Sequence, residues 1–240
     1  SEPHENSQLE TECLFGETIE ILENNLEWCF CKLLTDSYCG WIKRKDLGHM
    51  ENLTHRIYNK RSFLYTHQNA KSNYIHHLPL GSQLSIQKVR DNWAQVYLPD
   101  IHKNRIAYVP SNHIIVSSSK VKDWVQVAEQ LLNTPYKWGG RDTIGLDCSA
   151  LLQLSYQTYG ENIPRNTSDQ IKIQKKNIPH INQLERGCVV FWKGHAGIMV
   201  DKLNCIHANA FHTKTVIEPL HNVIFRNKEK YQIIKMMNFN

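Results

Sequence analysis

The chain has 240 residues, of which 41% are hydrophobic, enough to form the core of one large domain or of two to three small ones. Its formal net charge is +5, and seven glutamates among residues 1–23 leave the rest of the chain more basic still. No run of lysines and arginines is interleaved with aromatic residues. The sequence therefore argues against a nucleic-acid partner and is compatible with a small anionic substrate.

Seven cysteines without a CxxC pair argue against both a disulfide framework and a zinc site. We therefore expect no metal and no cofactor, and EDTA should leave any activity unchanged. The lack of a long apolar run and of a signal-peptide pattern favours a cytoplasmic protein with no membrane partner. A periplasmic or secreted protein is the alternative, because a leader could have been removed before Ser1. A monomer is a separate expectation.

Residues 1–8 are polar and are predicted to be a flexible N-terminus. In residues 9–50, short β-rich runs separated by polar turns predict a small barrel. Its strands are predicted at 18–22, 28–33 and 40–43.

A second small barrel is predicted in residues 54–117, because the pattern of the first recurs at an interval of 65 residues. Gly16 and Gly81 each precede a tryptophan by 12 residues, and an aromatic strand follows each tryptophan. A generic β-domain with buried aromatic residues is the alternative for both segments. Residues 117–120 are predicted to be a linker.

Residues 121–240 change to a helical period and then to strands, which predicts an α+β domain behind the two all-β barrels. The apolar spacing predicts helices over 121–132, from 148 to about 159, and over 168–175. Strands are predicted over 188–192, 196–200, 205–208, 216–217 and 231–236.

Cys148 is the first residue of the predicted central helix. A helix N-terminus lowers a thiol pKa and can hold an oxyanion, so we expect a nucleophile with a depressed pKa that iodoacetamide labels selectively near neutral pH. A cysteine that only fills core space is the alternative. His195 and His207 would lie side by side in a hairpin, as a base and its orienting partner or as core histidines.

Six segments, taken together and in order, resemble the NlpC-type cell-wall cysteine peptidases. They are YKWGG at 136–140, GLDCS at 145–149, Pro-Arg at 164–165 with Gln170, Arg-Gly at 186–187 followed by VFW at 190–192, HAGI at 195–198 and IHA at 206–208. The resemblance covers 121–240 and implies a papain-like fold, with helices packed on an antiparallel sheet. The two barrels resemble bacterial Src-homology-3-like domains.

The resemblance implies that Cys148 is the nucleophile, His195 the general base and His207 the residue that orients the base. Tyr136 would support the oxyanion beside the backbone N–H of Cys148. The implied reaction is hydrolysis of the bond between γ-linked D-glutamate and a diamino acid in murein peptides, as in γ-D-glutamyl-L-diamino acid endopeptidases. Cys188 stands where an aspartate is common, which leaves the partner of a neighbouring arginine open.

Two barrels before such a domain resemble the architecture of enzymes that trim soluble murein peptides with a free N-terminal L-alanine. The residues that would contact this substrate follow by position. They are Glu17, Tyr38 and Asp147 for the alanine ammonium, Ser149 with Thr167 or Ser168 for the D-glutamate carboxylate, and Arg165 as a further contact. Glu17 and Tyr38 as solvated surface groups are the other interpretation.

The leading hypothesis is a cysteine peptidase of cell-wall recycling or remodelling, with a murein peptide as its partner. A non-catalytic cell-wall-binding protein and a papain-like acyltransferase or amidase are the alternatives. Lipid-handling relatives of the acyltransferase type place the histidine before the cysteine, so the order of Cys148 and His195 counts against that alternative. Trp138 and Trp192 are expected in the core.

Overall fold

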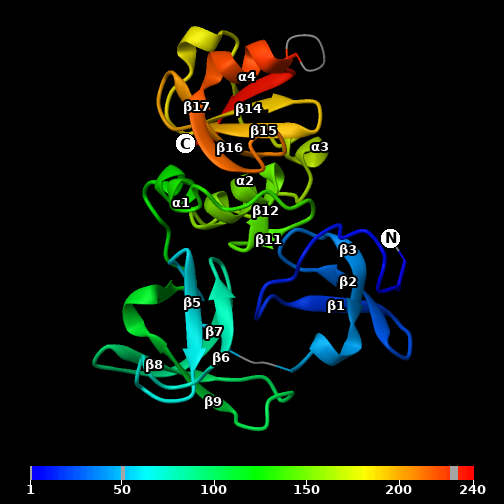
Figure 1. The fold of residues 1–240 in the computed structure, drawn as a ribbon, viewed down its shortest axis with the longest axis vertical. Helices are drawn as coiled ribbons and strands as arrows, with labels where there is room; N and C mark the ends of the chain where they lie inside the picture. Colours follow the sequence, from blue (N-terminus) through cyan, green and yellow to red (C-terminus); the bar gives the residue numbers. More distant parts are fainter. Residues whose placement is uncertain (1, 50–51, 228–231) are drawn as a thin grey trace. The chain divides into compact units, whose positions relative to one another are not determined.

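The structure is a computed structural model that describes residues 2–49, 52–227 and 232–240 (Figure 1). It divides into two compact units, Ser1–Ser119 and Lys120–Asn240. The boundary falls where the hydrophobic period of the sequence changes. Within the described ranges, no helix combines the length and the apolarity that crossing a membrane requires.

The N-terminal part of the first unit forms a three-stranded antiparallel sheet, in the order β1-β2-β3. In β2, Cys29, Cys31 and Leu33 are buried and alternate with partly exposed residues, which is the period-two pattern of a strand with one covered face. The predicted bounds of β2 are confirmed, whereas β1 and β3 differ from their predicted ranges by one or two residues at an end. The strands are β1 Ile19–Asn24, β2 Trp28–Leu33 and β3 Cys39–Lys43.

The rest of the first unit is a seven-stranded antiparallel sheet, in the order β10-β4-β7-β8-β9-β5-β6. Apolar residues from most of its strands form one buried cluster, to which Ile57, Leu84 and Val96 contribute. The strands are β4 His55–Ile57, β5 Arg61–Tyr65, β6 Tyr74–Pro79, β7 Gln83–Arg90, β8 Trp93–Tyr97, β9 Ile106–Pro110 and β10 Ile114–Val116.

The 65-residue repeat of the sequence reappears in the strand pairing. Where β1 pairs with β2, the register shifts between Ile21 and Glu23. Where β7 pairs with β8, it shifts between Ile86 and Lys88, at the equivalent positions of the repeat. A β-bulge bends a strand and increases its twist. The two segments therefore share a hairpin geometry as well as a sequence pattern.

The second unit is built on a six-stranded sheet, in the order β13-β18-β14-β15-β16-β17, which is antiparallel throughout. Figure 1 labels β14, β15, β16 and β17 of this sheet. The predicted strand over 188–192 is confirmed as β14. The bounds are β13 Lys176–Asn177, β14 Cys188–Trp192, β15 His195–Met199, β16 Asn204–Asn209, β17 Lys214–Pro219 and β18 Lys235–Asn238.

Helices cover both faces of this sheet. Trp192 of β14 packs in one cluster with Val223 of α4 (Leu220–Asn227). Phe191, the residue before Trp192 in β14, points to the other face of the sheet, where its ring contacts Phe239. Phe239 in turn contacts Tyr156 of α2 (Cys148–Gln157). The helix α1 (Trp124–Gln130) lies against α2. The central helix is consequently buried between α1 and the sheet.

Two helix predictions need correction, and a further helix is not predicted. The first helix begins at Trp124 instead of residue 121, because the Asp123 carboxylate accepts the N–H groups of Val125 and Gln126 as an N-cap. The predicted helix over 168–175 is a single turn, α3 (Thr167–Gln170). The helix α4 is not predicted, because the β-branched residues in its eight-residue span also suit a strand.

The last predicted strand is also shorter than expected. It was expected over 231–236, whereas β18 covers Lys235–Asn238, and Tyr231 lies outside the described residues. A short hairpin, made of the two-residue strands β11 (Arg141–Asp142) and β12 (Gly145–Leu146), precedes the central helix. It belongs to the stretch that the sequence analysis interprets as turns.

Arg186 links α1 to the sheet and settles the question that Cys188 raises. Its guanidinium donates to both carboxylate oxygens of Glu129, at 2.8 and 2.9 Å, and to Asp123 at 3.0 Å. The hydrogen bonds that Arg186 donates to Glu129 raise the pKa of Arg186 further above its ordinary value. The carboxylates of Glu129 in α1 and of its N-cap Asp123 are therefore the partners of Arg186.

Candidate active site

Cys148 begins α2 because the residue before it caps the helix. The carboxylate of Asp147 accepts the N–H of Ala150 at 2.9 Å. The loop before the cap is tight, since a Cβ on Gly140 would overlap the carbonyl oxygen of Gly145. These glycines and the aspartate together place the cysteine at the N-terminus of a buried helix, where the backbone N–H groups have no acceptor within the helix.

The cap residue is also half of a buried ion pair. Arg165 donates to both oxygens of Asp147, at 2.9 and 2.7 Å, and the two side chains are 1% and 10% exposed. Ser149 Oγ and the N–H of Gly139 donate to the same carboxylate at 3.0 Å. Together with Ala150, these donors fill the roughly four lone-pair sites of a carboxylate. Asp147 therefore belongs to a neutral pair, and its ammonium-binding role stays a prediction.

The Cys148 thiol lies against the start of β15. Its Sγ is 3.9 Å from the carbonyl oxygen of Gly194, and the backbone N–H groups of Ala196 and Ser149 donate to the sulfur. Burial raises the pKa of Cys148 to about 12, the charge of Asp147 adds to the rise, and the two N–H groups oppose it. The prediction of a depressed thiol pKa is wrong for this resting site, so the thiol needs a base.

We expect Cys148 to react with iodoacetamide at least about tenfold more slowly at pH 7 than Cys13 and Cys39, because alkylation requires an accessible thiolate. Cys148 is buried, whereas the other two are exposed. Peptide mapping after brief labelling measures the three rates. Cys205, a buried thiol of the same unit, is the control for burial alone. Labelling of Cys148 ahead of Cys13 would contradict the raised pKa.

The two predicted histidines meet in the β15–β16 hairpin. Nε2 of His195 and Nδ1 of His207 are 2.8 Å apart. On its other side, His207 Nε2 is 2.9 Å from Oε1 of Glu218 in β17. The guanidinium of Arg226 donates to both oxygens of Glu218, at 2.9 and 2.6 Å. A hydrogen-bonded chain therefore runs from the predicted base to a guanidinium.

Burial and hydrogen bonds together set the protonation states of His195, His207 and Glu218. Burial lowers the pKa of His195 to about 3, with a further decrease from the neighbouring His207. The pKa of His207 is also lowered by burial, against the opposing effect of Glu218. Burial alone would raise the pKa of Glu218, but hydrogen bonds from Arg226 and His207 lower it to about 2. At neutral pH the chain contains two neutral imidazoles and one ionised carboxylate.

The lowered histidine pKa predicts how stability depends on pH. Between about pH 6.5 and 3, unfolded His195 binds a proton that the folded residue does not, so the free energy of unfolding should decrease as the pH falls. Urea midpoints at pH 7, 6 and 5 measure this slope. His195→Gln should reduce it, and His221→Gln, at an exposed position, should not. An equal slope in both variants would contradict the assignment.

Tyr136 is held near Cys148 by backbone pairing. It forms a bridge with Leu146, and its N–H donates to the carbonyl oxygen of Thr213 at 2.8 Å. Burial raises the pKa of Tyr136 to about 12, and the charges of Cys148 and Asp147 add to the rise. The hydroxyl therefore keeps its proton and can donate a hydrogen bond, which an oxyanion requires. Its catalytic role stays a prediction.

The three hydroxyl residues predicted to meet a carboxylate lie on two neighbouring helices. Ser149, in the first turn of α2, accepts a hydrogen bond from Arg165 at 2.6 Å. Thr167 opens α3 and is half-buried, and Ser168 is exposed. The Gln170 amide ties α3 to α2 by donating to the Ser149 carbonyl at 3.0 Å. The binding roles of these hydroxyls stay predictions.

Glu17 and Tyr38 belong to the first unit. The carboxylate of Glu17 accepts the N–H of Leu14 at 2.8 Å, beside the start of β1. The N–H of Tyr38 donates to Asp36 at 2.9 Å, in the turn before β3. Their predicted contact with a substrate ammonium stays a prediction.

The two tryptophans of the second unit differ in burial. Trp192 is 2% exposed, as expected for a core residue. Trp138 is 59% exposed, so its predicted core position is wrong. It lies in a turn closed by the N–H of Gly140, which donates to the Lys137 carbonyl at 3.0 Å, and a tight turn leaves a large side chain on the surface.

Glu218 and Arg226 belong to the hydrogen-bonded chain of the two histidines, although neither residue is predicted from the sequence. The signal lies in strand register. Val216 pairs with His207, so Glu218, two residues further along β17, is on the same face of the sheet as the histidine. An isolated glutamate in a strand has many interpretations until this register is known.

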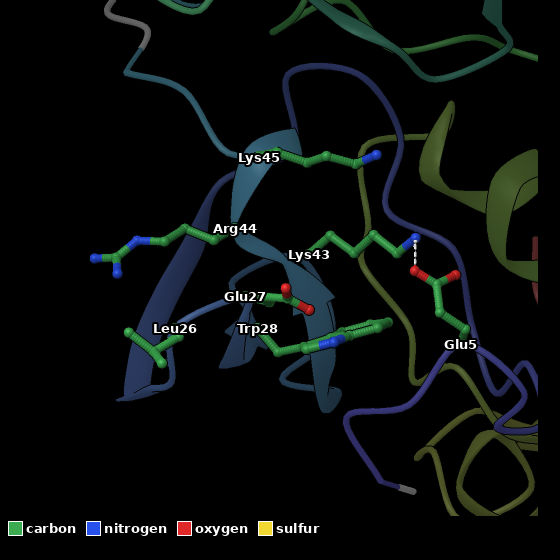
Figure 2. Close-up of a pocket in the computed structure, with 7 residues that line it drawn as sticks. All are labelled: Glu5, Leu26, Glu27, Trp28, Lys43, Arg44 and Lys45. Atoms are coloured by element: carbon green, nitrogen blue, oxygen red, sulfur yellow. Dashed lines mark ion pairs between the residues drawn. The ribbon is translucent and has the colours of Figure 1, made fainter.

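A separate surface pocket of about 510 Å³ lies in the first unit (Figure 2). The Lys43 ammonium is 5.6 Å from the centroid of the Trp28 ring and pairs with the Glu5 carboxylate. Neither a cysteine nor a histidine is among the residues that line it: Glu5, Leu26, Glu27, Trp28, Lys43, Arg44 and Lys45. Its lining therefore offers no cysteine–histidine pair. Across the part of the chain that the structure describes, no cluster of three metal-ligating side chains occurs.

Two family models match the chain. Residues 133–232 match the NlpC/P60 family. Residues 1–47 match the bacterial dipeptidyl-peptidase Sh3 domain. The first match includes Cys148, His195 and His207, and the second includes Glu17 and Tyr38.

Two relatives are similar over most of their length. The chain is 25% identical to Dipeptidyl-peptidase 6 of Lysinibacillus sphaericus, covering 87% of this chain and 83% of the relative. It is 24% identical to the gamma-D-glutamyl-L-lysine dipeptidyl-peptidase of Bacillus subtilis, covering 83% of this chain and 72% of the relative. A crystal structure of an NlpC/P60 family protein from Bacillus cereus has a TM-score of 0.81 at 19% identity, over 96% of this chain and 82% of that one. The last comparison shows a shared fold.

Proposed function

Because the second unit carries an NlpC/P60 peptidase domain and the chain begins with a bacterial dipeptidyl-peptidase Sh3 domain, we propose a specific cysteine-peptidase reaction. The substrate is a murein peptide with a free N-terminal L-alanine, and the bond cleaved joins γ-D-glutamate to a diamino acid. The observation that carries the proposal is the contact of Cys148 with the two residues that flank His195. His195 is in turn hydrogen-bonded to His207. Two relatives named as dipeptidyl-peptidases support release of a dipeptide.

In the first half of the proposed reaction, His195 takes the proton of the Cys148 thiol while the sulfur attacks the γ-carbonyl carbon of D-glutamate. The oxyanion receives hydrogen bonds from the N–H of Cys148, which has no acceptor within the first helical turn, and from the Tyr136 hydroxyl. The His195 imidazolium then protonates the amine of the diamino acid. The C–N bond breaks and leaves a thioester on Cys148.

In the second half, a water molecule gives a proton to neutral His195, and its oxygen attacks the thioester carbonyl. The C–S bond breaks, and Cys148 regains its proton from the imidazolium. One water is consumed for each peptide bond cleaved. The products are a dipeptide with a new γ-carboxylate and a free diamino acid.

The test is incubation of the purified chain with L-Ala-γ-D-Glu-diaminopimelate and with its lysine counterpart. The proposal predicts L-Ala-D-Glu and free diamino acid, and loss of both products in Cys148→Ala. Cys39→Ser, at an exposed cysteine of the first unit, is the matched control and should retain activity. Cleavage that survives Cys148→Ala would remove this residue from the mechanism. Sedimentation with sacculi without cleavage, or transfer of the acyl group to an amine, would favour the alternatives.

Acetylating the L-alanine should lower kcat/KM by roughly two to four orders of magnitude, because the Glu17 carboxylate proposed to bind the ammonium would lose its counter-ion. Glu17 and Tyr38 are the proposed contacts, and Asp147 is a weaker one because Arg165 already neutralises it. Kinetics with the free and acetylated tripeptides measure the ratio. Equal kcat/KM for both substrates would refute a requirement for the free amine.

A further inference from the structure

We infer that Glu218 is a positioning residue that fixes which ring nitrogens of His207 and His195 carry protons, and so leaves Nδ1 of His195 as the proton acceptor. The inference rests on the proposed function, since it assigns the base of that reaction. It depends on the chain of contacts from Arg226 to His195. Each link allows only one placement of the hydrogen.

The first link makes Glu218 an acceptor only. Arg226 donates to both of its oxygens, and His212 Nε2 lies 3.1 Å from Oε1. The Glu218 side chain is only 10% exposed, so water competes little for these oxygens. An ionised carboxylate has no hydrogen to donate. Any group within hydrogen-bond distance of Glu218 must therefore bring the hydrogen itself.

The second link fixes the tautomer of His207. Its Nε2 is 2.9 Å from Oε1 of Glu218, a distance at which two lone pairs would repel, so Nε2 carries the hydrogen. The amide nitrogen of Asn209 lies 3.3 Å from the same Nε2 and is itself a donor, so it is the weaker partner. Because His207 is neutral, its Nδ1 has a lone pair and accepts.

The third link fixes the tautomer of His195. Its Nε2 is 2.8 Å from Nδ1 of His207, which accepts, so Nε2 of His195 carries the hydrogen. In a neutral imidazole the other nitrogen then has the lone pair. Nδ1 of His195 is therefore the atom that can take the Cys148 proton. The placement of the hydrogens is set at Glu218, which is separated from the Cys148 thiol by the two histidines.

Arg226 explains why Glu218 orients His207 without converting it to an imidazolium. The guanidinium offsets the carboxylate charge that would otherwise favour a protonated ring. The other titratable groups near Glu218 are His212 and the Cys205 thiol, and burial raises the pKa of Cys205 to about 12. Glu218, paired with Arg226, thus accepts the hydrogen bond from Nε2 of His207 while the pair carries little net charge.

Glu218→Met removes the acceptor and tests the inference. The Asn209 amide can then donate to Nε2 of His207, which shifts the hydrogen to Nδ1 and, through the 2.8 Å contact, moves the hydrogen of His195 onto its own Nδ1. The base is lost, and kcat should fall by about 10²- to 10³-fold. Glu161→Met, which removes a carboxylate paired with Lys175 in the same unit, is the control and should leave kcat unchanged.

A second substitution separates positioning from mere support of the fold. Asn209→Asp in the Glu218→Met background places an acceptor 3.3 Å from Nε2 of His207 and should restore kcat by about tenfold or more. This recovery is expected only if the lost function is to accept a hydrogen bond. An unchanged kcat in folded Glu218→Met, or a loss that Asn209→Asp does not reduce, would overturn the inference.

The wild-type protein provides a test that needs no variant. Nitrogen-15 spectra of histidine-labelled protein should show protonated Nε2 and unprotonated Nδ1 in both His195 and His207. Protonated Nδ1 in either ring would overturn the inference, whether or not Glu218→Met folds. The spectra do not depend on turnover, so they also separate a failure of this inference from a failure to cleave murein peptides.

Discussion

Replacing His195 with alanine is expected to lower kcat by about 10⁴- to 10⁶-fold, one of the two largest effects we predict. The Cys148 thiol is buried and its pKa is raised to about 12, so it is not a nucleophile until a base removes its proton. Steady-state kinetics on the free tripeptide measure the effect. His207→Ala should cost less, about 10²- to 10³-fold, because packing retains part of the orientation of His195.

The matched control for both substitutions is His221→Ala. His221 is an exposed histidine of the same unit, outside the chain of hydrogen bonds that ends at Arg226. It should leave kcat unchanged. A His195→Ala variant that keeps its fold and loses no more activity than His221→Ala would exclude His195 as the base. Equal losses for His195→Ala and His207→Ala would leave the two roles interchangeable.

Replacing Asp147 with asparagine should lower the free energy of unfolding by about 3–5 kcal/mol, because it leaves the buried charge of Arg165 without its carboxylate. Asparagine is also a good N-cap, so the loss of the cap contributes little. Denaturant unfolding of the full chain, followed by a probe in the second unit, measures the change. Asp147→Asn in an Arg165→Met background should cost much less, since the unpaired charge is gone.

An exposed ion pair gives the comparison for this prediction. Asp169 pairs with Lys172 at 2.7 Å, but the two side chains are 48% and 72% exposed. Asp169→Asn should therefore change stability by no more than about 0.5 kcal/mol. Equal denaturation midpoints for Asp147→Asn and Asp169→Asn would contradict a structural role for the buried pair.

The position of Cys148 at a helix start could be predicted because its signals are local. Turn-forming glycines followed by helical apolar spacing place Cys148 at a helix start, and α2 begins at that residue. The strand β14 is predicted to the residue, because a continuous apolar run marks a strand that is buried on both faces. The family resemblance of this unit is confirmed by the match over 133–232.

The partners of site residues could not be predicted, because they depend on register and burial. Asp147 and Arg165 are 18 positions apart, and nothing in the sequence states that they form one ion pair. Glu218 reaches His207 only through the pairing of β16 with β17. The thiol pKa was predicted in the wrong direction, because the helix dipole is visible in the sequence whereas the desolvation of Cys148 is not.

The most direct test of the central claim is to look for the thioester on Cys148. The purified chain is mixed with excess free tripeptide, quenched in acid within one turnover and analysed by peptide mass mapping. We predict an L-alanyl-γ-D-glutamyl group on the peptide that contains Cys148, together with one released diamino acid per acylated enzyme. Release of diamino acid within the first turnover with no acyl group on Cys148, or with the group on another residue, would contradict the account.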